Sequence, residues 1–388
     1  MVTLRSTAVL GAATEPEQSV KHRRQGSPSG GSDSDDVIEY AEEDDSKTSK
    51  PEPRTTRQKV DRRAPSTFWK KSWKEQTWPE RLCNLAWTPP EIHYLKEESI
   101  DRGPPETMPL LPENMFILRY ALFPLAVQAL AYKYYPDYKW PVYVSYPFYL
   151  LSFIAFALGM VHRCNRYSLK YGNLDEKNIG RDRTPDKSVN HLARGIIAYM
   201  MVRTGMDFYL HYDKNIQPLT DITWTFPLRL CAWLVTLDYF FYCYHRTTHE
   251  CDALWFIHQH HHTTKHPVAI LSILAEDYQE FLEVFTVPLL ASLIVPLSFS
   301  EMWITLTYTI YVEMAGHSGV RAHWSHPVLF WLAPLDMELA VEDHDVHHRF
   351  GKSGRNYGKQ SRVWDRLFNT SAERIETFSN SKSAKKYL

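Results

Sequence analysis

The sequence lacks a charge bias. Its 44 lysines and arginines are balanced by 45 aspartates and glutamates, so the 388-residue chain has a formal net charge of −1 at pH 7. Because nothing draws such a chain as a whole toward phosphate groups, we predict no nucleic-acid partner. The balance is an average over unlike parts, since residues 1–66 hold few apolar side chains and the rest is rich in them.

Cysteine is also scarce, with five residues and no C-x-x-C pair. The spacing forms no regular disulfide framework, so we expect reduced, buried thiols in an intracellular protein. Two of them flank a histidine cluster described below, which leaves a soft metal ligand as the alternative to a packing role. The five are Cys83, Cys164, Cys231, Cys243 and Cys251, of which the last two flank the cluster.

Residues 1–66 lack any sustained apolar run and are expected to form a disordered tail. An acidic stretch at 33–45 is followed by a basic one at 54–63. Two interpretations are open: a regulatory or partner-binding tail, and a plain solvated terminus. The charged and apolar regions of a signal peptide are missing as well, so we expect no cleaved secretory signal.

From residue 67 the chain becomes aromatic and apolar. Residues 67–114 interleave tryptophans with lysines, which predicts either a membrane-surface segment or an amphipathic helix packed on the protein body. Residues 115–225 are expected to hold the first membrane helices and a linker. Within them, 115–132 and 141–161 have about the length that a bilayer crossing needs, roughly 20 residues.

Three other apolar stretches are harder to assign. Residues 226–244 predict a third crossing that leads into the first histidine cluster. Residues 195–212 carry Arg203 and Asp207, so this stretch is expected to be a helix packed against neighbours or one that dips without crossing. Residues 284–315 have a polar break at 298–301 and predict a shallow hairpin, which keeps the histidines before and after it on one side.

Histidine is the residue type that this chain has in excess. Thirteen of its eighteen histidines lie between residues 245 and 348. His245 and His249 stand one helical turn apart, and two later clusters share the spacing H-x-x-H-H. On a helix, positions i, i+3 and i+4 project from one face, so the three histidines of each such cluster are expected to converge on a point. The two clusters are His258, His261 and His262, and His344, His347 and His348.

So many convergent imidazoles exceed what one tetrahedral zinc can bind, and two metals are the economical interpretation. An imidazole shell is neutral, so the metals keep their charge and need nearby anions or oxygen-derived ligands. Iron and zinc both bind imidazole, but only iron is redox active and can activate dioxygen. The alternative is that histidines merely accumulate on a polar surface.

These motifs resemble the fatty acid hydroxylase and sterol desaturase superfamily. The resemblance covers about residues 226–370: H-R-x-x-H at 245–249, H-x-x-H-H at 258–262, G-H-S-G at 316–319 and H-D-x-H-H at 344–348. It extends to Asn356-Tyr357-Gly358 and to the run from Trp364 to Thr370, which is similar to the family's WD-x-[LF]-F-x-T signature. The third motif histidine, His258, follows the first, His245, by thirteen residues, which also matches the family spacing.

The resemblance implies an all-α integral membrane bundle with about four transmembrane or re-entrant helices. A cytosolic histidine-rich cap, residues 226–370, would hold two iron ions, and residues 371–388 would form a polar tail. It further implies an enzyme of the endoplasmic reticulum membrane, multi-pass, with its active site facing the cytosol. Such enzymes use dioxygen with electrons from cytochrome b5 and NAD(P)H. The chain has no His-Pro-Gly-Gly motif of a fused cytochrome b5 domain, so the donor is expected to be a separate protein.

Carried over residue by residue, the family pattern implies nine metal ligands. Asp345 is expected to orient a ligating imidazole or to be a capping or solvated carboxylate. Four nearby histidines, His260, His266, His323 and His326, are expected to support the site or lie on the surface, with His323 as a possible extra ligand. The nine ligands are His245, His249, His258, His261, His262, His317, His344, His347 and His348.

Two positions depart from the family pattern. Glu250 stands where many members have another histidine, and Asp277 and Glu280 fall near a second expected histidine. These carboxylates could replace imidazole as oxygen ligands. If they do not, one metal is expected to be held more weakly.

The expected substrate reaches the site from the lipid bilayer. A long-chain acyl group, a sphingoid base and a sterol all fit, and by analogy we favour hydroxylation of a fatty acid or fatty-acyl chain. The same histidines serve hydroxylation and desaturation, so a sterol desaturase or sterol methyl oxidase is the alternative. A non-oxidative zinc-binding membrane protein is the rival class, although no H-E-x-x-H motif is present.

Overall fold

The computed structural model describes residues 65–93, 104–174 and 180–377. The expected disordered tail lies outside the described residues except for its last two, and the expected polar tail lies outside them beyond residue 377. The described chain is strongly helical, as predicted. Its main elements are α1 (Trp78–Leu85), β1 (Glu106–Thr107), α2 (Leu110–Tyr134), α3 (Val142–Tyr171), α4 (Val189–His211), α5 (Phe226–Glu250), α6 (Asp277–Glu280), α7 (Val287–Ile294), α8 (Phe299–Gly316), β2 (Ala322–His323), α9 (Val341–Phe350) and α10 (Val363–Leu367).

Several shorter elements connect the helices near the predicted site. Between α5 and α6 the chain turns three times through 3-10 helices, and a π-helix joins α6 to α7. The short strands β1 and β2 pair in parallel, with Glu106 opposite Ala322 and Thr107 opposite His323. The connecting elements are η4 (Asp252–Ile257), η5 (His261–Thr263), η6 (Ala269–Ile273) and η7 (Phe281–Thr286), and later η8 (Phe330–Leu335) and η9 (Gly351–Ser353); before α5 lie η1 (Phe68–Lys70), η2 (Pro90–His93) and η3 (Asp186–Ser188).

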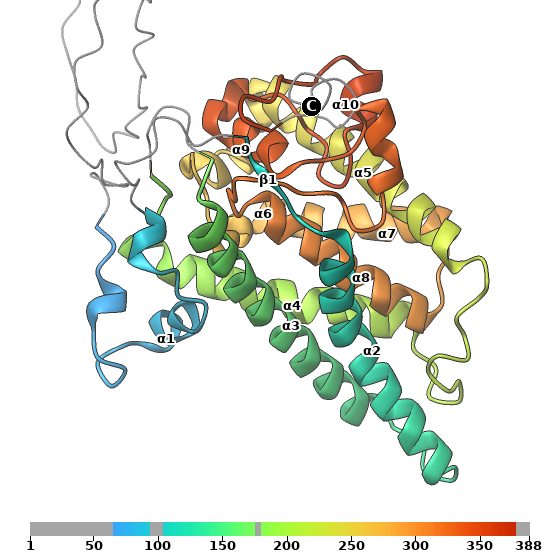
Figure 1. Ribbon diagram of the computed structural model, residues 1–388. Coiled ribbons are helices and arrows are strands. Elements are labelled where there is room, and N and C mark those ends of the chain that lie inside the picture. The colour runs from blue at the N-terminus through green and yellow to red at the C-terminus, as the bar shows by residue number, and fades with distance from the viewer. Residues whose placement is uncertain (1–64, 94–103, 175–179, 378–388) are drawn as a thin grey trace, which may run out of the picture. The chain divides into compact units, whose positions relative to one another are not determined.

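Helices α2 and α3 are the two of the described chain that are long and apolar enough to cross a membrane. They contain the predicted stretches 115–132 and 141–161 and lie side by side, with the turn between them at the opposite end of this body from α9 and α10 (Figure 1). Large apolar side chains remain exposed on both, such as Phe123 at 59% and Leu151 at 66%. Exposed apolar surface of this extent is typical of contact with lipid.

The predicted crossing at 226–244 falls in α5. This segment is a helix, but it is not among those long and apolar enough to cross a membrane. Arg229 and Asp238 interrupt its apolar run, and both bind protein partners rather than facing lipid. In α4, Arg203 and Asp207 are only 3% and 2% exposed, as expected for a helix packed against its neighbours. Two helices of the described chain are therefore long and apolar enough to cross a membrane, and the prediction of about four transmembrane or re-entrant helices is not confirmed.

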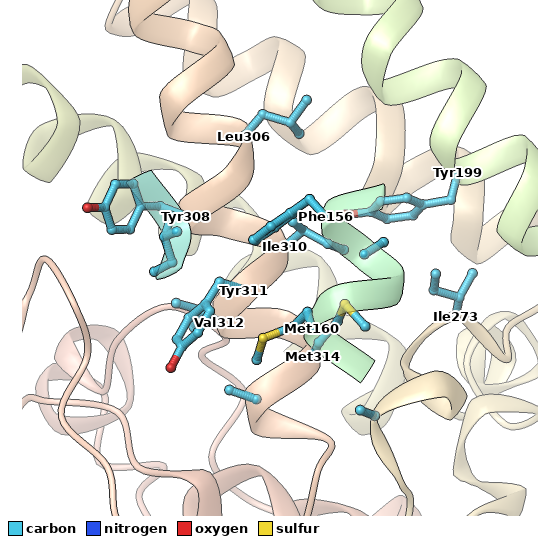
Figure 2. Packing of buried hydrophobic residues seen from close by; sticks show 14 of the residues in the cluster. Phe156, Met160, Tyr199, Ile273, Leu306, Tyr308, Ile310, Tyr311, Val312 and Met314 are labelled. Carbon is cyan, nitrogen blue, oxygen red and sulfur yellow. The ribbon is translucent and has the colours of Figure 1, made fainter. Parts of the chain in front are cut away.

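Helix α8 lies at the centre of the fold. It begins at Phe299, and the side chain of the preceding Ser298 caps it by accepting from the backbone of Glu301, so the predicted polar break at 298–301 is a helix start. All but one of its residues are buried, which is typical of a helix surrounded by protein. Figure 2 shows its side chains packed against Phe156 and Met160 of α3, Tyr199 of α4 and Ile273 of η6. Its C-terminal end delivers Gly316 and His317 to the predicted site.

A buried ion pair joins the segment before α4 to α9. Arg181 donates to Asp345 across 2.6 Å, and neither side chain is exposed to solvent. Gly319 has a φ of +61° and leaves no room for a Cβ beside this guanidinium, which explains the glycine at the end of the G-H-S-G motif. Asp345 also binds Arg349 at 3.1 Å. It is therefore neither a partner of a ligating imidazole nor a solvated carboxylate, contrary to both expectations.

Replacing Asp345 by asparagine leaves the buried Arg181 guanidinium without its counter-ion. We expect this to lower the free energy of unfolding by about 3 to 5 kcal/mol, since a lone buried charge cannot be rehydrated. Thermal unfolding in detergent measures the change. Asp252→Asn is the control, because Asp252 pairs with Lys352 on the surface with its side chain 90% exposed, and it should leave the unfolding temperature almost unchanged. Equal unfolding temperatures for both variants would contradict the interpretation.

Candidate metal centre

The structure gathers the nine predicted histidines into two buried groups. Within each group the potential ligand nitrogens all lie within 4.8 Å of one another. Each of the nine side chains belongs to a residue that is at most 4% exposed. The five-histidine group consists of His245, His249, His258, His262 and His347, and the four-histidine group consists of His261, His317, His344 and His348.

Each H-x-x-H-H cluster is shared between the two groups, so the prediction that its three histidines converge on one point is wrong. The i and i+4 members stay together: His258 and His262 in one group, His344 and His348 in the other. The i+3 member of each cluster joins the opposite group. Neighbouring residues in a helical turn point about 100° apart, so adjacent histidines cannot face the same metal. The repeated spacing thus supplies histidines to both groups.

The local structures that carry these histidines differ. His245 and His249 end α5, and the last cluster lies on α9, as the helical spacing predicts. Residues 258–262, in contrast, form a turn that runs into the 3-10 helix η5 rather than an α-helix. The turn still has a helical backbone at His260, with φ −64° and ψ −39°. This local helical backbone is sufficient to keep His258 and His262, at positions i and i+4, on the same side of the turn.

Backbone carbonyls fix the orientation of six imidazole rings through Nδ1. A carbonyl can only accept a hydrogen bond, so each of these Nδ1 atoms carries the proton and each Nε2 is left with a bare lone pair. This is the arrangement that metal-ligating histidines require. The pairs are His245 with Tyr357 (2.8 Å), His249 with Lys352 (3.1 Å), His261 with Leu274 (3.0 Å), His317 with Glu313 (2.7 Å), His347 with Arg355 (2.9 Å) and His348 with Thr264 (3.0 Å).

The resulting lone pairs face one another. Nε2 of His261 lies 3.2 Å from Nε2 of His317, and both rings have their only proton on Nδ1. Two such lone pairs cannot hydrogen bond and repel at this distance, unless a cation lies between them. Nε2 of His249 and Nε2 of His348 are also buried and find no hydrogen-bond partner in the described part of the chain. The donor set therefore fits metal cations in both groups.

Three of the orienting carbonyls belong to one segment, residues 352–358, which includes the Asn-Tyr-Gly motif. Asp365 of the WD motif holds this segment by accepting from the backbone N–H groups of Tyr357 (2.8 Å) and Gly358 (2.7 Å). Thr370, which ends the signature, donates its hydroxyl to the same carboxylate at 2.7 Å. The C-terminal signature thus positions carbonyls that orient ligands of the five-histidine group.

Asn356 and Asp238 also hold the segment around the Asn-Tyr-Gly motif in place. Asn356 has a φ of +64°, a conformation that asparagine tolerates better than most residues, and its side chain donates to the carbonyl of Asp343 at 2.9 Å. Asp238 of α5 accepts from the backbone N–H groups of Lys359 (2.7 Å) and Gln360 (2.8 Å). Sequence reasoning missed Asp238; the available signal was a carboxylate within the apolar run 226–244.

Comparison with known proteins identifies the family. The Fatty acid hydroxylase profile matches residues 230–370. The fatty acid hydroxylase vlmA of a Lecanicillium species is 35% identical over 292 residues, covering 68% of this chain and 78% of the relative. The chain belongs to the fatty acid hydroxylase family.

More distant relatives cover less of their own length. Human alkylglycerol monooxygenase is 24% identical over 42% of this chain and 34% of the relative. A Dictyostelium discoideum protein whose name assigns it methylsterol monooxygenase activity is 30% identical over 40% of this chain and 57% of the relative. No solved structure matches the chain.

Burial keeps the histidines of this fatty acid hydroxylase family member neutral. It lowers the pKa of His249 to about 4 and that of His261 to about 3. In the other seven, burial again is the main cause and neighbouring imidazoles add to it, so their pKa values fall well below the usual range. Neutral imidazole is the form that binds metals, so no proton has to be displaced near neutral pH.

None of the four remaining nearby histidines joins either group. His260 is ion-paired with Glu276 at 2.6 Å, and the Nδ1 of His326 accepts from the backbone N–H groups of Val328 (3.0 Å) and Leu329 (2.9 Å). His266 is buried, with its backbone N–H bound to Asp182, and His323 belongs to β2, so it is not the extra ligand considered above.

The carboxylates proposed to replace imidazole lie elsewhere as well. Glu250 follows His249 on α5, so its side chain faces outward and binds Arg246 at 2.8 Å. Asp277 is exposed, and Glu280 belongs to neither group. No described carboxylate therefore takes a ligand position in the two groups.

The cysteine prediction was correct in part. All five thiols are free, and Cys83 and Cys164 are buried as expected. Cys243 and Cys251 are exposed, because their positions on and just after α5 do not share the inward face of His245 and His249. Neither cysteine belongs to a histidine group, so neither is placed as a soft metal ligand.

Because the nine histidines form two separate groups, removing a ligand from one group should affect metal binding in that group alone. His348→Ala should reduce the metal content of the purified protein from about two ions per chain to about one, because it removes a ligand of the four-histidine group. Inductively coupled plasma mass spectrometry measures this content. His162→Ala is the control, because His162 is an exposed histidine of α3 that belongs to no group of potential metal ligands, and it should retain both ions. Equal metal content in wild type and His348→Ala would refute the assignment.

The lowered pKa values of these histidines also predict how the stability of the metal-free protein changes as the pH falls. Unfolded histidines take up protons below a pKa of roughly 6.5, whereas the folded His249 and His261 resist protonation down to about 4 and 3. The metal-free fold should therefore be most stable above pH 6.5 and lose stability as the pH falls from there toward 4. Thermal unfolding of chelator-treated protein between pH 7.5 and 4.5 tests this. Unfolding temperatures that rise on acidification would show the opposite linkage.

Proposed function

We propose that this protein is a dioxygen-dependent di-iron oxygenase of the membrane that hydroxylates a lipid, most simply a fatty acid or fatty-acyl chain. Its relatives are named as hydroxylases and monooxygenases of lipids, which makes the chain a lipid-modifying oxygenase. The observation that carries the finer proposal is the pair of buried, all-imidazole groups whose Nε2 lone pairs face one another.

The donor set favours iron as the working metal. The five-histidine and four-histidine groups would each hold one ion through neutral nitrogen ligands. Iron bound there supplies the one-electron chemistry that activates dioxygen, which zinc cannot supply. The protein's own contribution is placement. Carbonyls of Tyr357, Lys352 and Arg355 aim three imidazoles, and burial of the groups keeps bulk water away.

The surroundings of the two groups support an apolar substrate. Part of the buried apolar cluster in Figure 2 is close in sequence to the ligands: Ile273 precedes Leu274, whose carbonyl orients His261, and Met314 lies one turn before His317. Phe156 and Met160 of α3 belong to the same cluster. A hydrocarbon chain that reached the histidines from the bilayer would pass this apolar region.

We further propose a multi-pass protein of the endoplasmic reticulum membrane with its dimetal cap in the cytosol. Helices α2 and α3 would cross as a hairpin, which returns the chain to the side from which it entered. The Arg- and Lys-rich stretch 162–194, which runs from the last turns of α3 to the start of α4, favours the cytosolic side by the positive-inside rule. Cytochrome b5, reduced from NAD(P)H, is the proposed external electron donor.

A second candidate substrate is a sterol. The similarity to the Dictyostelium discoideum protein with a methylsterol monooxygenase name favours it, over 40% of this chain. Oxidation of a sterol methyl group or desaturation of a sterol ring would use the same nine histidines. The experiment below separates these outcomes by product.

Expression in yeast followed by lipid and sterol profiling tests the proposal. A hydroxylated fatty acid or acyl lipid should appear with the wild-type protein and be absent with His344→Ala, which lacks a ligand of the four-histidine group. A new oxidised sterol would select the second candidate. Purified protein that retains zinc, holds no iron and consumes no dioxygen with a reduced cytochrome b5 would refute the oxygenase.

A further inference from the structure

Three of the nine histidines have no carbonyl partner at Nδ1: His258, His262 and His344. In each, Nδ1 is buried and makes no close hydrogen bond in the described part of the chain, and the polar side chains of Gln279 and Glu283 lie beside that of His258. An imidazole with a free Nδ1 can rotate or change tautomer, which would remove its Nε2 lone pair from the metal. These three ligands therefore need another means of orientation.

A carboxylate lies in position to orient one of them. Oε1 of Glu283 is 3.9 Å from Nδ1 of His258. The carboxylate is held on both sides, because Oε1 accepts from the side-chain amide of Gln279 at 2.8 Å and Oε2 pairs with the ammonium group of Lys359 at 3.2 Å. It is thus presented to His258 in a fixed orientation.

The backbone around Glu283 is unusual. Residues 281–286 form the π-helix η7 between two α-helical stretches. A π-helix closes i to i+5 hydrogen bonds, so it adds a residue to the turn and rotates the side chains that follow. π-helical turns are rare and occur frequently at functional sites. Here the turn belongs to the element that carries Glu283 toward the five-histidine group.

The Glu283–Lys359 pair is costly to bury. The two side chains are 13% and 9% exposed, and desolvation of such a pair offsets most or all of its attraction. Stability alone therefore gives little reason for it. Lys359 directly follows the Asn-Tyr-Gly motif, and its backbone N–H is fixed by Asp238. The ion pair thus links the segment that orients His245 to the element that faces His258.

The negative charge of Glu283 can offset the positive charge of a metal ion bound nearby. Nine neutral imidazoles do nothing to offset the charge of two divalent cations, so an anion close to a ligand stabilises the bound metal. A carboxylate that accepts the Nδ1–H of an imidazole also makes its Nε2 a stronger donor. At 3.9 Å the contact closes by a small side-chain rotation or through one water molecule.

We propose that Glu283 is a positioning residue of the five-histidine group: it accepts the Nδ1–H of His258 and strengthens the binding of the metal in that group, with Lys359 and Gln279 holding it in place. The two groups are then inequivalent, since one contains a ligand supported by an anion. This inference rests on the metal-binding part of the proposed function and not on its substrate.

Cobalt binding to the full-length, chelator-treated protein in detergent tests the proposal. Co²⁺ has a visible spectrum that reports imidazole coordination, so two binding events can be followed in one titration. Wild type should bind two ions per chain. Glu283→Gln should weaken one of the two sites by roughly 10- to 100-fold and leave the other unchanged. Glu283→Asp keeps the charge and should restore part of the loss.

Two controls separate this role from general damage. Glu250→Gln removes a carboxylate that pairs with Arg246 on the outer side of α5 and belongs to no group of potential metal ligands, and it should titrate like wild type. The double variant Glu283→Gln with Lys359→Met removes the ion pair as a unit, so no unpaired ammonium remains, and should show the same selective loss as Glu283→Gln.

The outcome of the titration decides the proposal. Unchanged binding at both sites in Glu283→Gln, or equal weakening at both sites that the double variant relieves, would overturn it. Lipid oxidation plays no part in the measurement. A wild-type protein that binds two metals but oxidises no lipid would refute the oxygenase and leave the role of Glu283 standing.

Discussion

The constraint on which the structure depends is the placement of unprotonated imidazole nitrogens a few ångströms apart in a dry interior. Each buried imidazole has one proton, and the metal needs the other nitrogen free, so the proton must be bound elsewhere. In six of the nine rings a backbone carbonyl binds it. These carbonyls come from chain segments far apart in the sequence, from Thr264 to Tyr357. The fold must therefore hold several irregular segments in fixed positions around the helices that carry the ligands.

Buried carboxylates meet this requirement by binding backbone N–H groups of the irregular segments. Asp365 and Asp238 accept together from four consecutive residues, 357–360, and Glu342 of α9 accepts from residues 375–377. Burial raises the pKa of Asp365 to about 6 and that of Asp238 to about 7, while their hydrogen bonds oppose the shift. The motifs that surround the histidine clusters are thus the supports of the ligand rings, and the two kinds of motif form one functional unit.

Much of the fold and site follows from local patterns. The apolar stretches before residue 162 predict the helical hairpin of α2 and α3, and the spacing of His245 and His249 predicts that these two share a face of α5. The H-x-x-H-H spacing predicts correctly that its i and i+4 members lie together, but not that the i+3 member joins the other group. Other features depend on distant partners and could not be predicted. Arg229 and Asp238 lie in an apolar run that suggests a crossing, yet both bind other segments. Asp345 stands among ligands, yet its partner is Arg181, 164 residues away.

The sequence by itself determined the candidate ligands and the family of this protein, through eight imidazoles at helical spacing, the separate His317 and a C-terminal signature. Side-chain direction along a turn is local, so it can be read from spacing. Only the tertiary structure decided how the nine divide into groups of five and four, which carbonyl fixes each ring, and that the anion beside His258 is Glu283 rather than Glu250, Asp277 or Glu280. These choices depend on the packing of α5, α8 and α9 against irregular segments, and no local pattern encodes that packing.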